Sequence, residues 1–369
     1  MIRILHIIPV LDGGGVENLL LNYYTHINRD NFVFDFIVHG KKLGILESVF
    51  EGMGSKIFHI PTKHESFIQN LIAMKRIISS GNYDVIHAHQ REIGAFPMYF
   101  AKRAGIKVRI MHSHMAHMKE NYLHKTINRF LQIYLKQFST DWFACSIDAG
   151  RSLWGDKETK NGMVHIMNNA IDIEEFRFNA STRHEIRKEL GIEGKFVIGT
   201  VGRLSYQKNH EFLIKIFMEV QNKNSNTVLL VVGRGELEDE IKKQVFNLGL
   251  SEKVKFLGVH TDVPQLLQAM DVFLLPSRFE GLGIVFIEAQ AAGLVSFGSD
   301  VVVPRESKVT ELMNFISLDE STEYWAEEIL KYQYNYERKN MYKEIQHSGY
   351  EIKQEAKILE RFYEKRVNE

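Results

Sequence analysis

Short apolar runs alternate with helix-length amphipathic segments along most of the 369 residues. This alternation is typical of parallel sheets that are covered by helices on both faces. In the first half of the chain we expect strands near residues 3–10, 32–38, 84–87, 107–111, 142–144 and 164–167. In the second half we expect them near residues 196–201, 227–232, 254–257, 272–275, 294–297 and 315–317. Each half therefore predicts a doubly wound α/β unit of its own.

The length of the chain also favours two domains, because it exceeds what one typical hydrophobic core fills. We place the first domain at residues 1–172, a polar linker at 173–195 and the second domain at 196–345. A last helix within residues 346–369 is expected to pack back on the first domain. Two such Rossmann-like domains would face each other across a cleft and bind ligands at the carboxyl ends of their strands.

The composition, with 44% hydrophobic and 25% charged residues, is that of a soluble globular protein. Its formal net charge of zero lacks the basic excess of a nucleic-acid binder. A single cysteine, Cys145, excludes an internal disulfide and suits a reducing compartment. The N-terminus lacks the features of a signal peptide, and no stretch reaches the roughly 18 apolar residues of a membrane span. We therefore expect a cytoplasmic protein.

The segment PSRFEGLGIVFIEAQAAG, at residues 276–293, carries a carboxylate inside an apolar helical run. Burial of that carboxylate, Glu288, is costly unless it accepts hydrogen bonds, and a sugar diol supplies two O–H donors. The preceding loop holds Glu280, Gly281 and Gly283, so its bare backbone N–H groups can approach an anion at a helix N-terminus. The segment predicts a site for a nucleotide-sugar.

Two cations follow the first strand of the second domain, in the segment FVIGTVGRLSYQKNHEFLI. Arg203 offers forked donors and Lys208 a mobile point charge, so together they can neutralise a diphosphate. The alternative is a pair of solvated loop cations. We favour the diphosphate because Glu280 and Glu288 lie on the same predicted face.

Three glycine turns give weaker signals. Residues 13–15 are glycines before a helix, a geometry that suits a phosphate or simply a tight turn. They do not form the GxGxxG pattern of a dinucleotide site. Gly233 and Gly235 at another strand end read as a turn, and the exposed backbone at Gly258 suits contact with a base edge.

Histidines gather at a strand end in KVRIMHSHMAH. His112 and His114 share one side at period two, where an imidazole can serve a donor-sugar hydroxyl or a phosphate. The His-x-His pattern also raises a metal site, with His87, His89 and His117 as further ligands. No paired acidic ligands occur at a useful spacing, so we predict no metal.

The segment from Lys119 to Phe138 is basic and amphipathic. Such a helix can lie on an anionic membrane surface, or it is a domain helix with a solvated outer face. The apolar positions are Leu123, Ile127, Phe130, Leu131, Ile133 and Tyr134, interleaved with Lys125, Arg129 and Lys136.

Together these stretches resemble the retaining glycosyltransferases of family four, which have the GT-B fold. The first domain looks most like enzymes of bacterial exopolysaccharide or capsule assembly. The matching pieces are GGGVE at 13–17, RIMHSH at 109–114, FACS at 143–146, HIMNNAID at 165–172, GRLSYQKNH at 202–210, VVGRGE at 231–236, KFLG at 255–258 and the segment 276–293.

The resemblance implies a role for each matched residue. Glu288 would hold the ribose hydroxyls and Glu280 the hydroxyls of the donor sugar. Arg203 and Lys208 would bind the diphosphate and stabilise it as it leaves. His114 aligns with the family's cleft histidine, and His112 is its close competitor. The further donor-binding positions are Gly14, Gly15, Gly202, Gly258, Gly281, Leu282 and Gly283.

The chain departs from the family pattern in two places. Asn169 and Ala170 stand where the family usually has Asn-Gly-Val, and the run VVVPRES after Asp300 replaces a loop that commonly contains two glycines.

The resemblance implies a retaining transferase that moves a sugar from a nucleotide-diphosphate donor, with a UDP-sugar favoured, to a glycan or polyprenyl-linked acceptor. Arg203 and Lys208 would replace a metal ion in stabilising the charge of the leaving diphosphate, so no metal or cofactor is expected. The alternatives are a nucleotide-sugar epimerase of the same architecture and a non-catalytic sugar-nucleotide binding protein.

Overall fold

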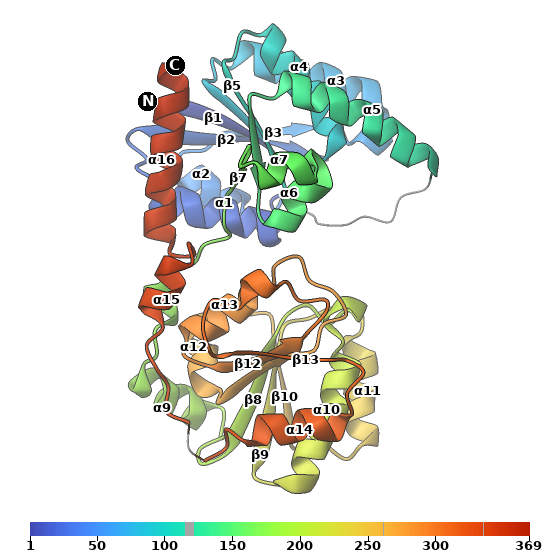
Figure 1. Cartoon of the computed structure of the whole chain (residues 1–369), viewed down its shortest axis with the longest axis vertical. Helices are drawn as coiled ribbons and strands as arrows, with labels where there is room; N and C mark the ends of the chain where they lie inside the picture. The colour runs from blue at the N-terminus through green and yellow to red at the C-terminus, as the bar shows by residue number, and fades with distance from the viewer. Residues whose placement is uncertain (115–121, 261, 335) are drawn as a thin grey trace. The chain divides into compact units, whose positions relative to one another are not determined.

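The computed structural model describes residues 1–114, 122–260, 262–334 and 336–369, without the side chains of residues 122–125 (Figure 1). The described chain divides into two compact units. The first comprises Met1–Ile171 and Gly349–Glu369, and the second comprises Asp172–Ser348.

The first unit is built on a parallel seven-stranded sheet in the order β3-β2-β1-β4-β5-β6-β7. Its strands are β1 (Ile2–Ile7), β2 (Phe32–His39), β3 (Ile57–Ile60), β4 (Val85–Ala88), β5 (Val108–Ser113), β6 (Asp141–Ala144) and β7 (Val164–Ile166). Six of these strands were expected, and β3 was not. The strand order reverses between β1 and β4, which is where doubly wound sheets bind ligands.

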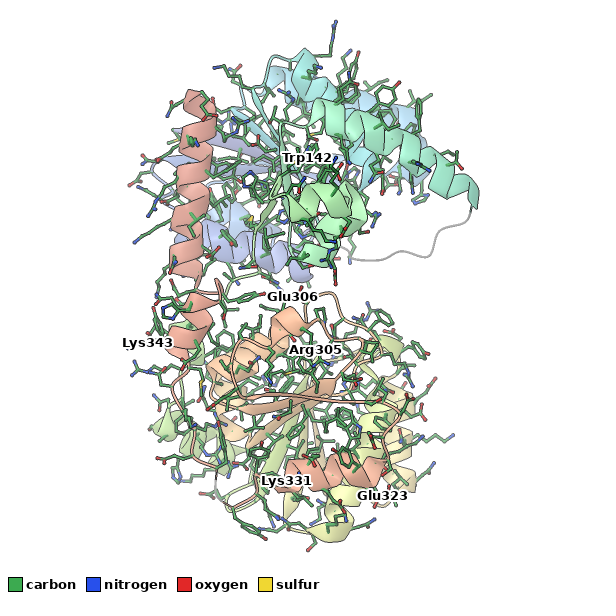
Figure 2. All side chains as sticks on the ribbon, in the orientation of Figure 1. Trp142, Arg305, Glu306, Glu323, Lys331 and Lys343 are labelled. Carbon is green, nitrogen blue, oxygen red and sulfur yellow. The ribbon has the colours of Figure 1, made fainter. Side chains whose placement is uncertain are left out.

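Helices cover both faces of this sheet and close two hydrophobic cores. They are α1 (Gly15–His26), α2 (Glu47–Gly52), α3 (Lys63–Ser80), α4 (Ala95–Arg103), α5 (Tyr122–Phe138), α6 (Ile147–Trp154), α7 (Asp156–Lys160) and α16 (Ile352–Asn368), with a short 3₁₀ helix η1 (Glu92–Gly94). In the core on the α6 side, Trp142, labelled in Figure 2, stacks on Trp154 with ring centroids 5.0 Å apart.

The C-terminal helix α16 returns to the first unit, as expected, and packs on α1 (Figure 1). Its buried stripe follows helical spacing, since Ile352, Ala356, Leu359 and Tyr363 are all in one hydrophobic core with the residues of β1 and β2. The helix therefore completes a core that the first 171 residues leave open.

The second unit has a parallel six-stranded sheet in the order β10-β9-β8-β11-β12-β13. Its strands are β8 (Phe196–Val201), β9 (Thr227–Val232), β10 (Val254–Gly258), β11 (Val272–Leu275), β12 (Val295–Ser299) and β13 (Met313–Ile316). Its helices are α8 (Ile173–Phe176), α9 (Ala180–Glu189), α10 (His210–Lys223), α11 (Glu238–Asn247), α12 (Val263–Ala269), α13 (Ile284–Ala291), α14 (Thr322–Leu330) and α15 (Tyr342–His347), with 3₁₀ helices η2 (Tyr206–Lys208) and η3 (Arg305–Ser307). Here the strand order reverses between β8 and β11.

The segment expected to be a linker, residues 173–195, differs from that expectation because it forms α8 and α9 within the second unit. Two arginines of α9, Arg183 and Arg187, donate to the carboxylate of Asp271 and to nearby backbone carbonyls. The half-buried guanidinium of Arg338 donates to the carbonyls of the same turn. The bonds of Arg183 and Arg187 fix the segment to the turn that precedes β11.

Among the described residues, no helix combines the length and the apolar character that crossing a bilayer demands.

Candidate functional site

Two loops of the second unit meet at the point where its strand order reverses. One follows β8 and contains η2, and the other follows β11. The backbone N–H of Arg278 donates to the carbonyl of Gln207 at 2.7 Å, and its guanidinium donates to the carbonyl of Tyr206 at 2.9 Å. The same guanidinium lies over the Tyr206 ring, 4.2 Å from its centroid. The loops therefore form one surface at the carboxyl edge of the sheet.

Glu280 is the best-held side chain on this surface. Its Oε1 accepts from Lys208 Nζ at 2.7 Å and from Ser277 Oγ at 2.6 Å. The carboxylate is 4% exposed and the lysine side chain 17%, so the ion pair is largely shielded from water. An ammonium has three donors and only one is used here, so Lys208 can also bind a phosphate oxygen. Burial with fixed partners orients Glu280 before any ligand arrives.

Glu288 lies on α13 in the opposite situation. The side chain is half-buried and has no hydrogen bond to any described residue. Burial raises the pKa of its carboxyl group to about 7. This carboxylate has lost water without gaining hydrogen-bond donors, and the two hydroxyls of a ribose would supply such donors.

Arg203 is not brought into the Lys208–Glu280 pair. Its Nε donates to Glu236 Oε2 at 3.0 Å, and both side chains are exposed, at 73% and 51%. An exposed pair of this kind is worth at most about 1 kcal/mol, so the guanidinium can exchange partners at little cost.

Glycines allow the ends of three strands to approach one another. The N–H of Gly233 donates to the carbonyl of Gly258 at 2.7 Å. A Cβ on Gly233 would lie 2.1 Å from the carbonyl oxygen of Gly202, and Gly233 has a positive φ of 128°. The turn that we expected at Gly233 and Gly235 is thus a close backbone packing, and Gly202 and Gly258 are its neighbours.

The loop before α13 holds the remaining predicted donor positions. Gly281 is exposed and has open space where a Cβ would be, and Leu282 is buried. Gly283 has a φ of +74° and is the N-cap of α13. The run that replaces the family's usual glycine loop borders this region, because the N–H of Glu280 donates to the carbonyl of Val302 at 3.2 Å. Arg305, labelled in Figure 2, lies over the ring of Phe315 at 4.3 Å.

In the first unit, the glycine turn before α1 is covered by a carboxylate. Glu17 is buried, and its Oε2 lies 2.5 Å from the place of a Cβ on Gly14. Burial raises the pKa of Glu17, while backbone hydrogen bonds at Glu17 and Gly14 oppose the shift. A phosphate at Gly14 therefore requires the Glu17 side chain to move, whereas the space at Gly15 is open.

The predicted histidines lie at the carboxyl ends of β4 and β5, next to the point of reversal in the first sheet. The ring of His112 is fully buried, whereas His114 is half-buried. Of the two candidates, His114 is the one with an exposed surface for a ligand. His114 Nε2 lies 2.9 Å from His89 Nδ1.

Among the described residues, which do not include His117, two groups of three histidines have ligand atoms within 4.8 Å of one another, and they share one residue. One group is His6, His87 and His89, and the other is His89, His112 and His114. Both consist of imidazoles alone. The neighbouring nitrogens that face each other are at hydrogen-bonding distance, 2.9 Å for the pairs that involve His89.

The sequence did not reveal the side chains that hold the predicted site residues Glu280 and His114 in place. Ser277 fixes Glu280, and Gln207 Nε2 donates to the carbonyl of Phe279 at 3.0 Å. A serine next to Pro276 has no distinguishing signal. His89 was named only as a possible metal ligand, and His6, which is in register with His87 on β1, was missed.

The chain matches two family models. A model of the glycosyl transferases group 1 covers residues 182–348, and a model of glycosyltransferase family 4 covers residues 13–175. EpsF of Bacillus subtilis (strain 168), named as a glycosyltransferase, is 30% identical over 337 residues, which span 89% of this chain and 87% of EpsF.

Further relatives are named with their substrates or ligands. The UDP-Gal:α-D-GlcNAc-diphosphoundecaprenol α-1,3-galactosyltransferase of Escherichia coli is 25% identical, over 81% of this chain and 80% of that enzyme. The crystal structure of HepE from Anabaena with UDP superposes with a TM-score of 0.73 at 19% identity, covering 97% of this chain and 94% of HepE. The names favour transfer over the epimerase and binding-protein alternatives. The two parallel-sheet units and the match to a solved structure show the GT-B fold. The two family models and the 30% identity with EpsF over most of both chains show that the chain belongs to the glycosyltransferases of family 4.

Proposed function

We propose that the chain transfers a sugar from a UDP-sugar, with retention of configuration, to a glycan or polyprenyl-linked acceptor in exopolysaccharide or capsule assembly. The observation that carries the proposal is a pair of carboxylates in the second unit. Glu280 is held by Lys208 and Ser277, and the side chain of Glu288 on α13 has no hydrogen bond to any described residue. Two comparisons support it: HepE is solved with UDP, and the Escherichia coli relative is named for UDP-galactose and a diphosphoundecaprenol-linked acceptor.

Each side chain receives one part of the donor. Glu288 accepts hydrogen bonds from both ribose hydroxyls. Oε2 of Glu280, whose hydrogen bond from Gln207 Nε2 is long at 3.5 Å, accepts from hydroxyls of the transferred sugar. Lys208 and Arg203 bind the diphosphate, with the amides at residues 281–283, and His114 donates to the transferred sugar. Gly202 and Gly258 border the nucleotide. Gly15 approaches the phosphate, and Gly14 does so once Glu17 has moved.

The chemistry follows from charge. Transfer passes through an oxocarbenium-like state while negative charge grows on the leaving diphosphate. Lys208 is already fixed by its pair with Glu280, so it stabilises that charge without first having to be oriented. The proposed reaction uses these cations and amides and requires no metal.

The test compares two nucleotides in the full-length protein. Lys208→Ala should weaken UDP binding about tenfold or more, since a charge-assisted hydrogen bond is lost, and should leave UMP binding within about twofold. Titration calorimetry measures both affinities. Lys215→Ala, which removes a surface lysine paired with Glu211 at 2.8 Å, is the matched control. Equal losses for UDP and UMP, or no loss for either, would contradict the assignment.

Contact with the membrane surface is the second part of the proposal. Three helices of the first unit, α3, α4 and α5, pack side by side (Figure 1). They carry exposed large apolar side chains. We call these side chains the apolar face: Phe67, Ile68, Ile72, Tyr99, Ile127, Phe130, Ile133 and Tyr134. Exposed Lys75, Arg76 and Arg129 border it. Apolar side chains bordered by cations suit the surface of an anionic bilayer, where a lipid-linked acceptor is anchored.

The expected membrane segment from Lys119 to Phe138 contributes only in part. Residues 119–121 and the side chain of Lys125 lie outside the described residues. Lys136 pairs with Glu158 at 2.5 Å and lies over the ring of Trp142, so it packs against its own unit. Arg129 is the described cation of that segment that stays exposed.

A further inference from the structure

Five histidines converge at the carboxyl edge of the first sheet, although a single histidine would be enough for one contact with a ligand. His6 is in β1, His87 is the last but one residue of β4, and His112 is in β5. His89 and His114 follow directly after β4 and β5. The rings of His6, His87, His89 and His112 are buried, and only His114 has an appreciable exposed surface.

Their hydrogen bonds form two separate chains. In the first, His6 Nδ1 lies 2.9 Å from His89 Nε2, and His89 Nδ1 lies 2.9 Å from His114 Nε2. In the second, Tyr363 Oη lies 2.9 Å from His87 Nδ1, and His87 Nε2 lies 3.3 Å from His112 Nδ1. The first chain therefore runs from the buried core to the exposed ring, and the second ends on a buried ring.

All five rings are held neutral. Burial lowers the pKa of each imidazole, and the neighbouring histidines lower it further at the buried positions. The rings of Phe34 and Phe36 pack on His6 at 4.4 and 5.5 Å between centroids. A neutral imidazole carries one N–H and one bare nitrogen, so each chain has a direction.

The inner end of the first chain decides that direction. His6 Nε2 is buried and has no hydrogen-bond partner among the described residues. If His114 donated inward, His6 Nε2 would carry an N–H with no acceptor, and buried N–H groups without an acceptor are rare. If His6 donates outward, the unpaired atom is a bare nitrogen. His89 then donates through Nδ1 to His114 Nε2.

From this geometry we infer that His89 and His6 are positioning residues for His114, and that their chain of hydrogen bonds holds His114 as the tautomer with its proton on Nδ1. His114 then presents a hydrogen-bond donor to its ligand and keeps no free nitrogen to act as a base. A hydroxyl oxygen of a sugar or an oxygen of a phosphate can accept a hydrogen bond from this N–H. The catalytic consequence rests on the proposed function, whereas the tautomer does not.

The experiment reads the tautomer directly. The full-length protein is labelled with ¹⁵N-histidine, and long-range ¹H–¹⁵N spectra distinguish ring nitrogens with and without a proton. The signals that disappear in His114→Gln are those of His114. We expect a proton on His114 Nδ1 and a bare Nε2. A proton on Nε2, or shifts of a metal-bound ring together with stoichiometric zinc in the purified protein, would overturn the inference.

Two substitutions at His89 separate positioning from packing. His89→Phe removes the donor to His114, whereas His89→Asn places an amide N–H near the position of Nδ1. His87→Phe is the matched control, because it is the same change on the neighbouring buried ring that stacks on His89 with centroids 4.5 Å apart but belongs to the other chain. We expect His89→Phe to release the His114 tautomer, and expect His89→Asn to retain it.

The rate of UDP release is measured with the UDP-sugar that the wild-type protein turns over. His89→Phe should lower the maximal rate about tenfold with UDP affinity unchanged, and His89→Asn should restore it to within about threefold. Equal effects of His89→Phe and His87→Phe on the rate and on the His114 signals would overturn the inference. If no UDP-sugar is turned over by the wild type, the proposed function fails while the tautomer is still decided by the spectra.

Discussion

Glu280 and Glu288 are the same residue type in two opposite environments. The Glu280 side chain is buried with a lysine and a serine on one oxygen, and that of Glu288 is half-buried with no donor among the described residues. The loops of the protein itself orient the Glu280 carboxylate, whereas a ligand would have to supply the donors to Glu288. Since burial raises the pKa of Glu288 to about 7 from 4.5, its charge destabilises the empty protein.

This difference predicts a gain in stability when the charge is removed. Below pH 4.5 Glu288 is protonated in both the folded and the unfolded protein, so its charge does not lower the free energy of unfolding there. The loss of stability grows as the pH rises and is complete above about pH 7. Glu288→Gln should therefore raise the free energy of unfolding by up to about 3 kcal/mol at pH 8 and leave it nearly unchanged at pH 4.5. Denaturant titrations at both pH values measure this, with the exposed Glu189→Gln as control. An equal effect at both pH values would contradict the raised pKa.

The same pKa makes UDP binding dependent on pH. In the proposed site the ribose hydroxyls donate to the ionised carboxyl group of Glu288, so below about pH 7 binding would first have to release a proton. UDP affinity should fall by up to about tenfold per pH unit between pH 7 and pH 5, and this fall should be absent in Glu288→Gln. Calorimetric titration across that range measures it. A wild-type affinity that is flat from pH 8 to pH 5 would argue against Glu288 as the ribose ligand.

At the residue scale, the sequence identified side chains that stand out chemically. Glu288 was identified because it is a carboxylate within an apolar run, and His114 because it follows another histidine at a spacing of two. Neither the Ser277 contact to Glu280 nor the Glu17 carboxylate over Gly14 could be predicted, because both depend on a rotamer and a loop path that local sequence does not determine. The pair between Arg203 and Glu236 was missed because its partner comes from the next strand-end loop.

At the scale of elements, the predicted strands were nearly complete because parallel strands buried on both faces are continuous apolar runs. The exception is β3, a four-residue edge strand whose exposed His59 interrupts the run. The last strand begins two residues earlier than expected, at Met313. The segment 173–195 looked like a linker because its helices are short and polar. Its attachment depends on contacts distant in sequence, such as those of Arg183 and Arg187 with Asp271 and of Phe176 with Gln268.

The strand-end glycines support a prediction at this scale. Gly233→Ala places a Cβ 2.1 Å from a backbone carbonyl oxygen at a φ of +128°, so the ends of β8 and β9 must separate. We expect a loss of about 2–4 kcal/mol in the free energy of unfolding. Gly281→Ala, where nothing lies within 4 Å of the added Cβ, should change stability by no more than about 0.5 kcal/mol. Similar losses in the two variants, measured by denaturant titration, would show that the close approach at Gly233 is not maintained.

At the scale of the whole molecule, the sequence predicted two parallel-sheet units and the return of the last helix, because the apolar stripe on α16 has no partner within its own segment. It did not predict that α3 and α4 extend the apolar face beyond α5. Those helices are less amphipathic than α5, and their exposed residues are recognised only once packing has assigned the buried ones.

The apolar face predicts association with anionic membranes. Replacing Ile68 and Ile133, which are 70% and 62% exposed, by glutamate should lower the fraction of protein that sediments with anionic vesicles. Phe246→Glu is the control, because Phe246 is 74% exposed on α11 of the second unit. Equal sedimentation of all variants, or no preference for anionic over neutral vesicles, would exclude this face as the membrane contact.

The central claim is that the second unit binds the nucleotide through Glu288, and the affinity of the full-length protein for UDP at pH 8 tests it most directly. Titration calorimetry compares the wild type with Glu288→Gln and with Glu189→Gln. The loss of two hydrogen bonds to a charged acceptor predicts an affinity about 100-fold weaker in Glu288→Gln and unchanged in Glu189→Gln. UDP affinity in Glu288→Gln within twofold of the wild type would contradict the claim.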